Sequence, residues 1–488
     1  MLLTGPEKRL VVSVTGPQVD DVHVQVLGAA AAGAIAELRL DLWEDPNPSA
    51  LLALESRPPM LVTDRPVREG GRDSAEDAVR LARLAAAGRG GAEAVDIEIS
   101  AWQAARDLDF GKAQRLVSHH IFEPGVADVD SEIARLRSAG ADAIKLAVMP
   151  RDIAESLRLL ESQRLIDGPA TLIGMGEYGT ITRVLGAAYG AGLIYAAADS
   201  GDAAAPGQVP VSAMRDLYRF ERVAREGVEA WFGVVGDPIS HSRSPELHNL
   251  AFEHLKLPYC YVPLRTRDLG ILLEALEPHP CRGLSVTLPH KEAALRLAAE
   301  ADEDARRIGA ANTLTRRASG GWLAQNTDAP AIVAALGGAS ALSGRRALVL
   351  GAGGVARAAV RALTVSGAEV TVCNRTFERA ASLTRDLGGQ VVRSVGPDVT
   401  EWDVIVNATS LGMSPSVETT PLPDGRFRAG QVVFDTVYAP AETRLLMEAA
   451  SQGATAVRGT EMFLQQARRQ LEIWTGREAP MGAWRSRF

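Results

Sequence analysis

The sequence has few cysteines, few aromatic residues and no long apolar run. Of its 488 residues, three are cysteines and 5% are aromatic. Three cysteines cannot form a disulfide framework, and these lack the spacing of metal ligands, so no metal site is expected. No apolar segment reaches the ~20 residues of a membrane span, and residues 1–10 carry charges instead of an apolar signal core. We therefore expect a cytoplasmic protein without a membrane partner.

Basic residues are not in excess either. Lysine and arginine together number 52 against 60 acidic residues, which gives a net charge of −8 at pH 7. An acidic chain without basic blocks is not expected to bind nucleic acid as its main function. The length is sufficient for about two to four domains with cores of their own. These features do not fix the oligomeric state, and a monomer is compatible with them.

The first half of the chain shows a repeating strand–helix pattern. Short apolar runs rich in β-branched residues occur at residues 10–14, 37–42, 60–63, 94–99, 115–118, 143–147, 170–174 and 193–197. Segments with helical periodicity lie between them, such as residues 74–88, 130–140 and 151–165. Eight alternating units predict a closed (β/α)8 TIM barrel, which carries its chemistry at the carboxyl ends of the strands.

Lys145 is the most informative residue of this pattern. It lies on the sixth predicted strand, between apolar neighbours that face the other way. A lysine buried inside a barrel is costly unless it finds partners or loses its charge. Burial and neighbouring cations would favour a neutral, nucleophilic amine of the Schiff-base type. The alternative is a lysine that extends along the strand to reach solvent.

Other polar residues are predicted at the same end of the barrel. His119 and His120 are adjacent on a strand, so at most one of them faces the interior. Glu37, Arg39 and Asp41 are expected to share one strand face. Arginines near the barrel mouth predict an anionic substrate, although each could be a surface residue. These arginines are Arg39, Arg65 and Arg183.

Several motifs in this half match a known family. They are Glu37-Leu-Arg39-Leu-Asp41, Arg65 through Arg68-Glu69-Gly70-Gly71, Ser118-His119-His120, Ile144 through Pro150, Met175-Gly176 and Ala205-Pro206-Gly207-Gln208. With them, residues ~8–220 resemble type I 3-dehydroquinate dehydratases. The resemblance implies that Lys145 forms an imine with the ketone of 3-dehydroquinate and that His120 is the general acid/base. It implies substrate binding by Ser13, Glu37, Arg39, Arg65, Arg183 and Gln208. Two positions depart from the family pattern: Ala204 replaces a serine and Ile121 an aspartate.

The second half contains a dinucleotide-binding pattern. The strand Arg346–Leu350 runs into Gly351-Ala-Gly353-Gly354-Val-Ala356 and then into a helical segment. A glycine-rich loop between a strand and a helix is typical of Rossmann folds. The next strand ends at Asn374 without the acidic residue that binds an NAD ribose. Arg375 suits a 2′-phosphate instead, so we expect NADP, unless that arginine is only a surface residue.

Polar clusters flank this loop at residues 240–245, 285–291, 310–313 and 325–328. Their hydroxyls and amides suit a polyhydroxylated substrate, and Lys291 with Asp328 could relay a proton. Taken singly, such clusters also form turns and caps.

As a set, and with Asn407-Ala-Thr409, Asp435 through Tyr438 and Gln466-Ala467, these clusters resemble shikimate dehydrogenases. The resemblance implies reduction of 3-dehydroshikimate to shikimate, with Lys291 and Asp328 as the catalytic pair. It implies substrate binding by Ser242, Ser244, Thr287, Asn312, Tyr438 and Gln466. It implies NADP binding by Gly351, Gly353, Gly354, Ala356, Asn374, Arg375, Thr376, Arg379 and Met413. Ser285 and Ala329 depart from the usual asparagine and glycine.

The two resemblances predict a bifunctional enzyme whose second half consumes the product of the first. We expect a dehydratase domain at residues 1–226, a substrate-binding domain at 229–335 completed by helices at 459–488, and a Rossmann domain at 336–458. One alternative is a catalytically silent sensor, which predicts loss of Lys145, His120, Lys291 or Asp328; all four are present. The other is an NAD-linked quinate dehydrogenase, which Arg375 disfavours.

Overall fold

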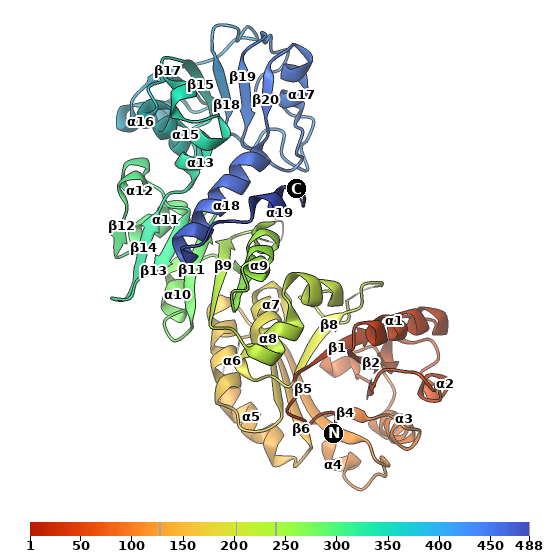
Figure 1. Cartoon of the computed structure of the whole chain (residues 1–488). Coiled ribbons are helices and arrows are strands. Elements are labelled where there is room, and N and C mark those ends of the chain that lie inside the picture. Colours follow the sequence, from red (N-terminus) through yellow and green to blue (C-terminus); the bar gives the residue numbers. More distant parts are fainter. Residues whose placement is uncertain (126–127, 202, 240–241, 488) are drawn as a thin grey trace. The chain divides into compact units, whose positions relative to one another are not determined.

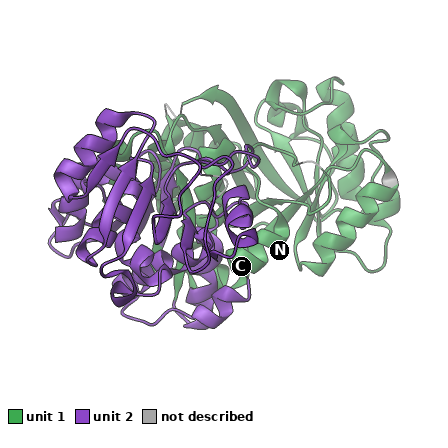
Figure 2. Cartoon of the chain, turned by 90° about the horizontal axis from the view of Figure 1, so that it is seen from above, with its two compact units in different colours: residues 1–231, 258–280 green, residues 232–257, 281–488 purple. Residues whose placement is uncertain are grey.

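A computed structural model describes residues 1–125, 128–201, 203–239 and 242–487. The chain divides into two compact units (Figure 2). Unit 1 contains residues 1–231 and 258–280, and unit 2 contains residues 232–257 and 281–488.

Unit 1 is built on an eight-stranded sheet (Figure 1). Its strand order is β7-β6-β5-β4-β3-β2-β1-β8. Its strands are β1 (Arg9–Val14), β2 (Ile35–Arg39), β3 (Met60–Thr63), β4 (Ala94–Glu98), β5 (Gln114–Pro124), β6 (Ala143–Met149), β7 (Ala170–Gly174) and β8 (Leu193–Ala197). All neighbours in this order pair in parallel. The edge strands also meet, because the Gly192 amide donates to the Ala170 carbonyl (3.2 Å) and the Leu193 amide to Thr171 Oγ1 (3.1 Å). The predicted TIM barrel is therefore confirmed.

Helices alternate with these strands. They are α1 (Val19–Ala31), α2 (Ser49–Leu52), α3 (Asp77–Arg89), α4 (Trp102–Ala105), α5 (Val129–Ser138), α6 (Ile153–Leu165), α7 (Gly176–Leu185) and α8 (Phe220–Glu226). Short helical turns are η1 (Leu40–Leu42), η2 (Val67–Glu69), η3 (Gly186–Tyr189) and η4 (Ala213–Leu217), and unit 1 also contains β10 (Tyr259–Arg265) and α10 (Leu269–Ala275). Asp128 and Asp152 cap the first turns of α5 and α6 by accepting hydrogen bonds from backbone amides.

Two barrel strands, β2 and β5, end three or more residues away from the predicted position. β2 ends at Arg39, and residues 40–42 form the tight turn η1, so Asp41 does not lie on the strand face assigned to it. Asp41 still accepts two hydrogen bonds from the Arg39 guanidinium, each of 2.8 Å, because the turn brings its carboxylate beside Arg39. β5 is longer than predicted and pairs with β6 up to Pro124, with a register shift after Ile121.

Unit 2 contains the strands of two further sheets. In the first, its strands follow the order β9-β11-β13-β14-β12, and in the second the order is β17-β16-β15-β18-β19-β20. The strands of the first are β9 (Ala230–Gly236), β11 (Cys281–Val286), β12 (Glu300–Ala301), β13 (Thr313–Arg316) and β14 (Trp322–Gln325). Those of the second are β15 (Arg346–Leu350), β16 (Glu369–Cys373), β17 (Gln390–Val392), β18 (Val404–Asn407), β19 (Val432–Asp435) and β20 (Thr455–Val457).

The second sheet is a Rossmann sheet, as predicted. All of its strand pairs are parallel, and the direction of winding reverses between β15 and β18. Nucleotides bind outside the carboxyl ends of the strands at such a reversal. Buried alanines and valines pack α15 (Gly354–Val365) onto this sheet. The other helices of the unit are α9 (Ser244–His254), α11 (Lys291–Leu297), α12 (Glu303–Ile308), α13 (Asp328–Ala335), α14 (Ala339–Leu342), α16 (Phe377–Leu387), α17 (Arg444–Ser451), α18 (Gly459–Thr475) and α19 (Met481–Arg485).

In the described ranges, none of the helices combines the length and the apolar character that crossing a membrane requires.

Candidate functional sites

The interior of the barrel is layered. An apolar layer includes one residue from most strands: Val11, Ile35, Leu61, Ala94, Leu116, Ala143 and Leu193. Because side chains alternate along a strand, the residue two positions later also faces inward. These residues form a buried layer of mostly polar side chains: Ser13, Glu37, Thr63, Asp96, Ser118, Lys145 and Tyr195. The strands therefore concentrate polar chemistry inside the barrel, toward its carboxyl end.

Lys145 lies in this polar layer and is 3% exposed. Its Nζ is 2.6 Å from Oδ2 of Asp96 and 3.8 Å from Oε1 of Glu37. The same nitrogen lies 4.5 Å from the centre of the Tyr195 ring. The alternative of a lysine that reaches solvent is therefore wrong. The sequence predicted cations next to Lys145, but the charged groups closest to its Nζ are the carboxylates of Asp96 and Glu37.

Asp96 was not singled out from the sequence, although it joins Lys145 to Arg65. The Arg65 guanidinium donates to Oδ2 of Asp96 at 2.7 Å and also pairs with Glu98. Burial alone would raise the pKa of Asp96, but the charges of Arg65 and Lys145 outweigh it and lower the pKa to about 2. Strand alternation from Ala94 could have identified both acidic residues, since it places Asp96 and Glu98 on the inner face of β4.

The three predicted arginines have different partners. Arg39 is bidentate to Asp41, and Arg65 is held by Asp96, Glu98 and Ser118. Arg183 is 3% exposed and forms no ion pair with any described residue. It donates only to the Tyr195 carbonyl (3.3 Å), and its Nε is buried without a partner. Burial lowers the pKa of Arg183 to about 10, and its guanidinium is the one of the three that has no carboxylate partner.

The two histidines of β5 face opposite ways, as predicted. Nδ1 of His119 is 2.8 Å from Oε2 of Glu132, on helix α5, whereas His120 lines the barrel cavity. Nδ1 of His120 lies 3.3 Å from Oε2 of Glu69, which also accepts from the His120 amide (3.2 Å). Burial, together with Arg65 and Lys145, holds the pKa of His120 well below its usual value. Glu69 belongs to one of the family motifs, but no periodicity predicts that the η2 turn brings it to His120.

The remaining residues assigned to this site also line its cavity. Ser13 donates to Oε2 of Glu37 (2.7 Å) and accepts from Nε2 of Gln208 (3.1 Å). Gln208 is in turn held by the backbone amide of Ala204, which lies at the position without the expected serine hydroxyl. The cavity joins all eight predicted residues of this half: Ser13, Glu37, Arg39, Arg65, His120, Lys145, Arg183 and Gln208.

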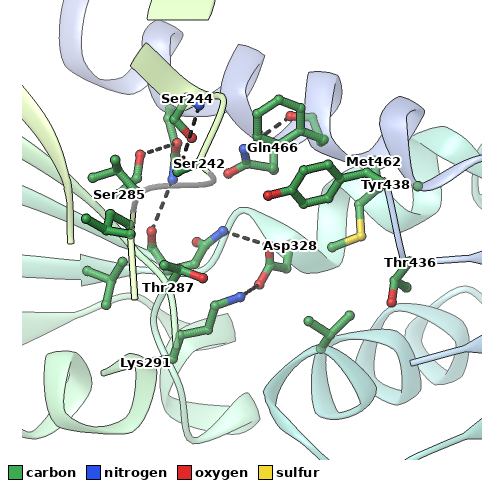
Figure 3. A pocket seen from close by; sticks show the side chains of 18 of the residues that line it. Ser242, Ser244, Ser285, Thr287, Lys291, Asp328, Thr436, Tyr438, Met462 and Gln466 are labelled. Carbon is green, nitrogen blue, oxygen red and sulfur yellow. Dashed lines mark hydrogen bonds and ion pairs between the residues drawn. The ribbon is translucent and has the colours of Figure 1, made fainter. Parts of the chain in front are cut away.

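A second polar cavity lies within unit 2 (Figure 3). Nζ of Lys291, the first residue of α11, is 2.5 Å from Oδ2 of Asp328, the first residue of α13. Nδ2 of Asn312 donates to the other carboxylate oxygen of Asp328 at 2.8 Å. The Ala329 departure is accommodated, because the Asn326 side chain accepts hydrogen bonds from the amides of residues 328 and 329 at the helix start.

Hydroxyls and amides complete the walls of this cavity. Figure 3 shows Tyr438 and Gln466 reaching in from the side opposite Lys291. The Tyr438 ring stacks on Phe463 with centroids 5.1 Å apart. Ser242, Ser244 and Thr287 also line it, whereas Ser240 and His241 lie outside the described residues. Ser285 donates to Oε1 of Gln470 (2.7 Å), a buried residue of α18 that sequence reasoning missed.

The glycine-rich loop lies at the carboxyl end of β15. Gly351 has φ +117°, and a Cβ there would lie 2.8 Å from the Ala408 carbonyl oxygen, so only glycine fits. A Cβ on Gly353 would meet nothing within 4 Å, which leaves room for a phosphate beside the first amides of α15. Gly354 begins this helix, while Ala356 is buried in the core beneath it. The loop thus has the shape and the donors that a pyrophosphate needs.

Two exposed arginines follow β16. Arg375 and Arg379 are exposed, and neither is ion-paired within the described ranges. Asn374 donates to the Thr376 carbonyl (2.8 Å) and fixes the turn before α16. Free guanidinium groups at this strand end fit the 2′-phosphate of NADP. Met413 is 47% exposed and does not line the cavity of Lys291.

Family models match four segments of the chain: type I 3-dehydroquinase at residues 10–225, shikimate dehydrogenase substrate binding domain at 234–314, shikimate/quinate 5-dehydrogenase at 334–419, and shikimate 5′-dehydrogenase C-terminal domain at 459–483. The shikimate dehydrogenase (NADP(+)) of Syntrophobacter fumaroxidans is 41% identical over 253 residues, 51% of this chain and 88% of that protein. A solved shikimate 5-dehydrogenase from Thermus thermophilus, in complex with NADP(H) and shikimate, aligns with a TM-score of 0.49 and 37% identity over 53% of this chain and 97% of that chain.

One relative spans both halves. The chain is 36% identical over 495 residues to the chloroplastic bifunctional 3-dehydroquinate dehydratase/shikimate dehydrogenase of Arabidopsis thaliana. The alignment covers 96% of this chain and 82% of that protein. The chain therefore belongs to the family of bifunctional 3-dehydroquinate dehydratases/shikimate dehydrogenases.

Proposed function

We propose that the chain catalyses two successive reactions, dehydration of 3-dehydroquinate to 3-dehydroshikimate and reduction of 3-dehydroshikimate to shikimate with NADPH. The observation that carries the first reaction is a single buried cavity holding an amine (Lys145), a histidine–carboxylate pair (His120 and Glu69) and an arginine without a carboxylate partner (Arg183). Family membership supports both reactions and their order in one chain.

In the dehydratase site, Arg183 binds the substrate carboxylate, since its guanidinium has no carboxylate partner. His120 takes a proton from the Lys145 ammonium, and the freed amine attacks the ketone carbon. The proton returns to the hydroxyl of the adduct as this group leaves as water, so a protonated imine remains and His120 is neutral again. His120 then removes a proton from the adjacent carbon, because its lowered pKa keeps it neutral and able to accept one. The same histidine returns the proton to the departing hydroxyl, and hydrolysis of the imine frees 3-dehydroshikimate and Lys145. Ser13, Glu37, Arg39, Arg65 and Gln208 shape the site around the substrate.

In the reductase site, Lys291 donates a proton to the substrate carbonyl oxygen as the carbonyl becomes an alcohol. Bound NADPH supplies the hydride. Asp328 orients Lys291 through their 2.5 Å ion pair, and Asn312 fixes Asp328. Ser242, Ser244, Thr287, Tyr438 and Gln466 bind the hydroxyl and carboxylate groups of the substrate.

The proposed NADP site uses the residues of the second sheet. The loop Gly351 to Gly354 would hold the pyrophosphate, with Ala356 permitting close helix packing. Arg375 and Arg379 would bind the 2′-phosphate, with Asn374 and Thr376 shaping the turn, and Met413 would approach the nicotinamide.

We also propose domain boundaries at residues 1–226, 229–335 with 459–488, and 336–458, supported by matched segments that end at residue 225 or begin at residues 234, 334 and 459. The partners are small molecules, and a cytoplasmic location is supported by three free cysteines.

One assay tests the proposed function. Purified protein is given 3-dehydroquinate and NADPH, and the absorbance of reduced nicotinamide is followed. We expect a decrease that requires both compounds. A chain that is only a sensor would consume neither. A quinate dehydrogenase would instead prefer quinate with NAD over shikimate with NADP in the oxidative direction.

A further inference from the structure

One tyrosine inside the barrel has a hydroxyl without a hydrogen-bond partner among the described residues. Tyr195 belongs to β8 and lies two positions after Leu193 of the apolar layer, so it faces inward. The residue is 4% exposed, and its hydroxyl oxygen is buried and unpaired. Buried hydroxyls are nearly always hydrogen-bonded in folded proteins. An unpaired one in a cavity therefore indicates that its partner arrives with a ligand.

The residues around Tyr195 indicate which ligand would supply this partner. It lines the same cavity as His120 and Arg183. Nζ of Lys145 lies 4.5 Å from its ring centre. Arg183, whose Nε is also unpaired, donates to the Tyr195 backbone carbonyl. Two unsatisfied polar side chains thus lie side by side on one wall, next to the proposed nucleophile.

No other hydroxyl is free in the part of this cavity that the structure describes. Among its described lining residues, Ser13 and Tyr195 are the ones with a hydroxyl. Ser13 both donates to Glu37 and accepts from Gln208. Residue 204, at the mouth of the same cavity, is an alanine. Among the described lining residues, a polyhydroxylated substrate can therefore find an uncommitted hydroxyl only at Tyr195.

We propose that Tyr195 is a further substrate-binding residue of the dehydratase site. Its hydroxyl hydrogen-bonds a ring oxygen substituent of the bound substrate, close to the carbon that joins Lys145. Its aromatic face, already beside Nζ, stabilises the positive charge of the protonated imine. This inference rests on the proposed dehydratase function and assigns it one more contact.

The test compares Tyr195→Phe with the wild type in the full-length chain. The variant keeps the ring and loses only the hydroxyl. We expect kcat/KM for 3-dehydroquinate to fall about 5- to 20-fold, the range of one lost hydrogen bond in a buried site. The melting temperature of the free protein should stay equal or rise, because the unpaired hydroxyl contributes nothing to the unliganded fold. The rise in melting temperature on adding substrate should be smaller than in the wild type.

Tyr189→Phe is the matched control. Its hydroxyl lies 2.8 Å from Nδ1 of His279, outside the cavity, so its loss should lower the melting temperature and leave kcat/KM unchanged. A third variant, Tyr195→Leu, removes the ring as well. It should trap less imine with borohydride than Tyr195→Phe does.

Unchanged kcat/KM in Tyr195→Phe would overturn the role of the hydroxyl. So would a lower melting temperature of the free protein with an unchanged response to substrate, since that pattern marks a structural hydroxyl. Equal imine trapping in the Phe and Leu variants would overturn the role of the ring. If the wild type itself does not dehydrate 3-dehydroquinate, the proposed function fails, which is a different result. The melting transition reports folding of the barrel in every variant, and shikimate oxidation in unit 2 serves to normalise the amount of intact chain.

Discussion

Nζ of Lys145 and Oδ2 of Asp96 form a 2.6 Å ion pair across the barrel interior, with β5 between their strands. Asp96 is simultaneously bound to Arg65. The carboxylate therefore holds the lysine in place before substrate arrives, and the proposed attack on a ketone would start from this ion pair. If the proposed imine forms, the positive charge of the lysine nitrogen would be kept beside Asp96, so that no new charge would be buried.

Replacement of Lys145 should remove one activity and spare the other. We expect Lys145→Ala to lower dehydration by more than about 10³-fold, because no other group in the cavity can form the imine. Shikimate oxidation should remain close to the wild-type rate. Lys112→Ala, at an exposed lysine, is the matched control and should leave both rates unchanged.

Borohydride adds a direct readout of that residue. Reduction in the presence of 3-dehydroquinate should attach the substrate to the Lys145 peptide in the mass spectrum. An unmodified peptide would contradict the Schiff-base assignment. Loss of both activities in a folded Lys145→Ala protein would contradict independent sites.

The dehydratase should remain active at mildly acidic pH. The proposed base His120 can accept a proton only while neutral, and its pKa is held well below its usual value of 6.5 by burial and by Arg65 and Lys145. The rate should therefore be flat from neutral pH to below 6.5 and fall only as the histidine protonates at lower pH. A profile of kcat/KM between about pH 4.5 and 8 measures this. An acidic inflection above pH 6.5 would show that the burial seen here does not govern His120.

Cofactor choice should depend on the exposed arginines after β16. Arg375→Ala combined with Arg379→Ala should raise KM for NADPH about 10- to 100-fold, the expected effect of losing charge-assisted contacts to a phosphate. KM for NADH should change little, because that cofactor has no 2′-phosphate. Arg385→Ala, on the same helix, is the control and should behave as the wild type. Equal effects on both cofactors would instead indicate a general loss of binding.

Because the pKa of Asp64 is raised, the free energy of unfolding of the barrel should decrease as pH rises. Burial and the neighbouring Asp73 raise its pKa to about 7, although Arg83 opposes the shift. Between the unfolded value of 3.8 and about 7, the folded state retains a proton that the unfolded state has lost. Stability therefore falls as pH increases through this window, by at most about 1.4 kcal/mol per pH unit for one proton.

Asp64→Asn should remove that dependence, because the amide does not ionise. Melting temperatures of the variant and the wild type, compared at pH 5 and pH 8, provide the measurement. The melting temperature of the variant, relative to that of the wild type, should be higher at pH 8 than at pH 5. A larger increase in melting temperature at pH 5 than at pH 8 would contradict the raised pKa of Asp64.

Regular alternation made much of the barrel site predictable. The inward direction of Lys145 and the opposite directions of His119 and His120 follow from strand geometry alone. Asp96 could have been found by the same reasoning, since it lies two residues after the apolar Ala94. Asp41 was misplaced because β2 ends at Arg39, where the backbone leaves the extended region (φ −86°, ψ 80°).

Residues that reach a site from loops were not predictable in this way. Glu69 meets His120 through the η2 turn, which Gly70 ends with φ +78°. Gln470 meets Ser285 although 185 residues separate them in sequence. Neither contact follows from a local period, and both depend on how distant elements pack. The lack of an ion-pair partner for Arg183 likewise emerges only when the neighbouring carboxylates are seen to have other partners.

The apolar layer inside the barrel determines the end at which substrate can enter and products can leave. Leu3 and the other residues of the apolar layer close the barrel at the amino ends of its strands. Substrate and products must therefore pass through the opening at the carboxyl ends. The water released by dehydration and the unsaturated product leave through this one opening, so a ligand bound there would block the release of both.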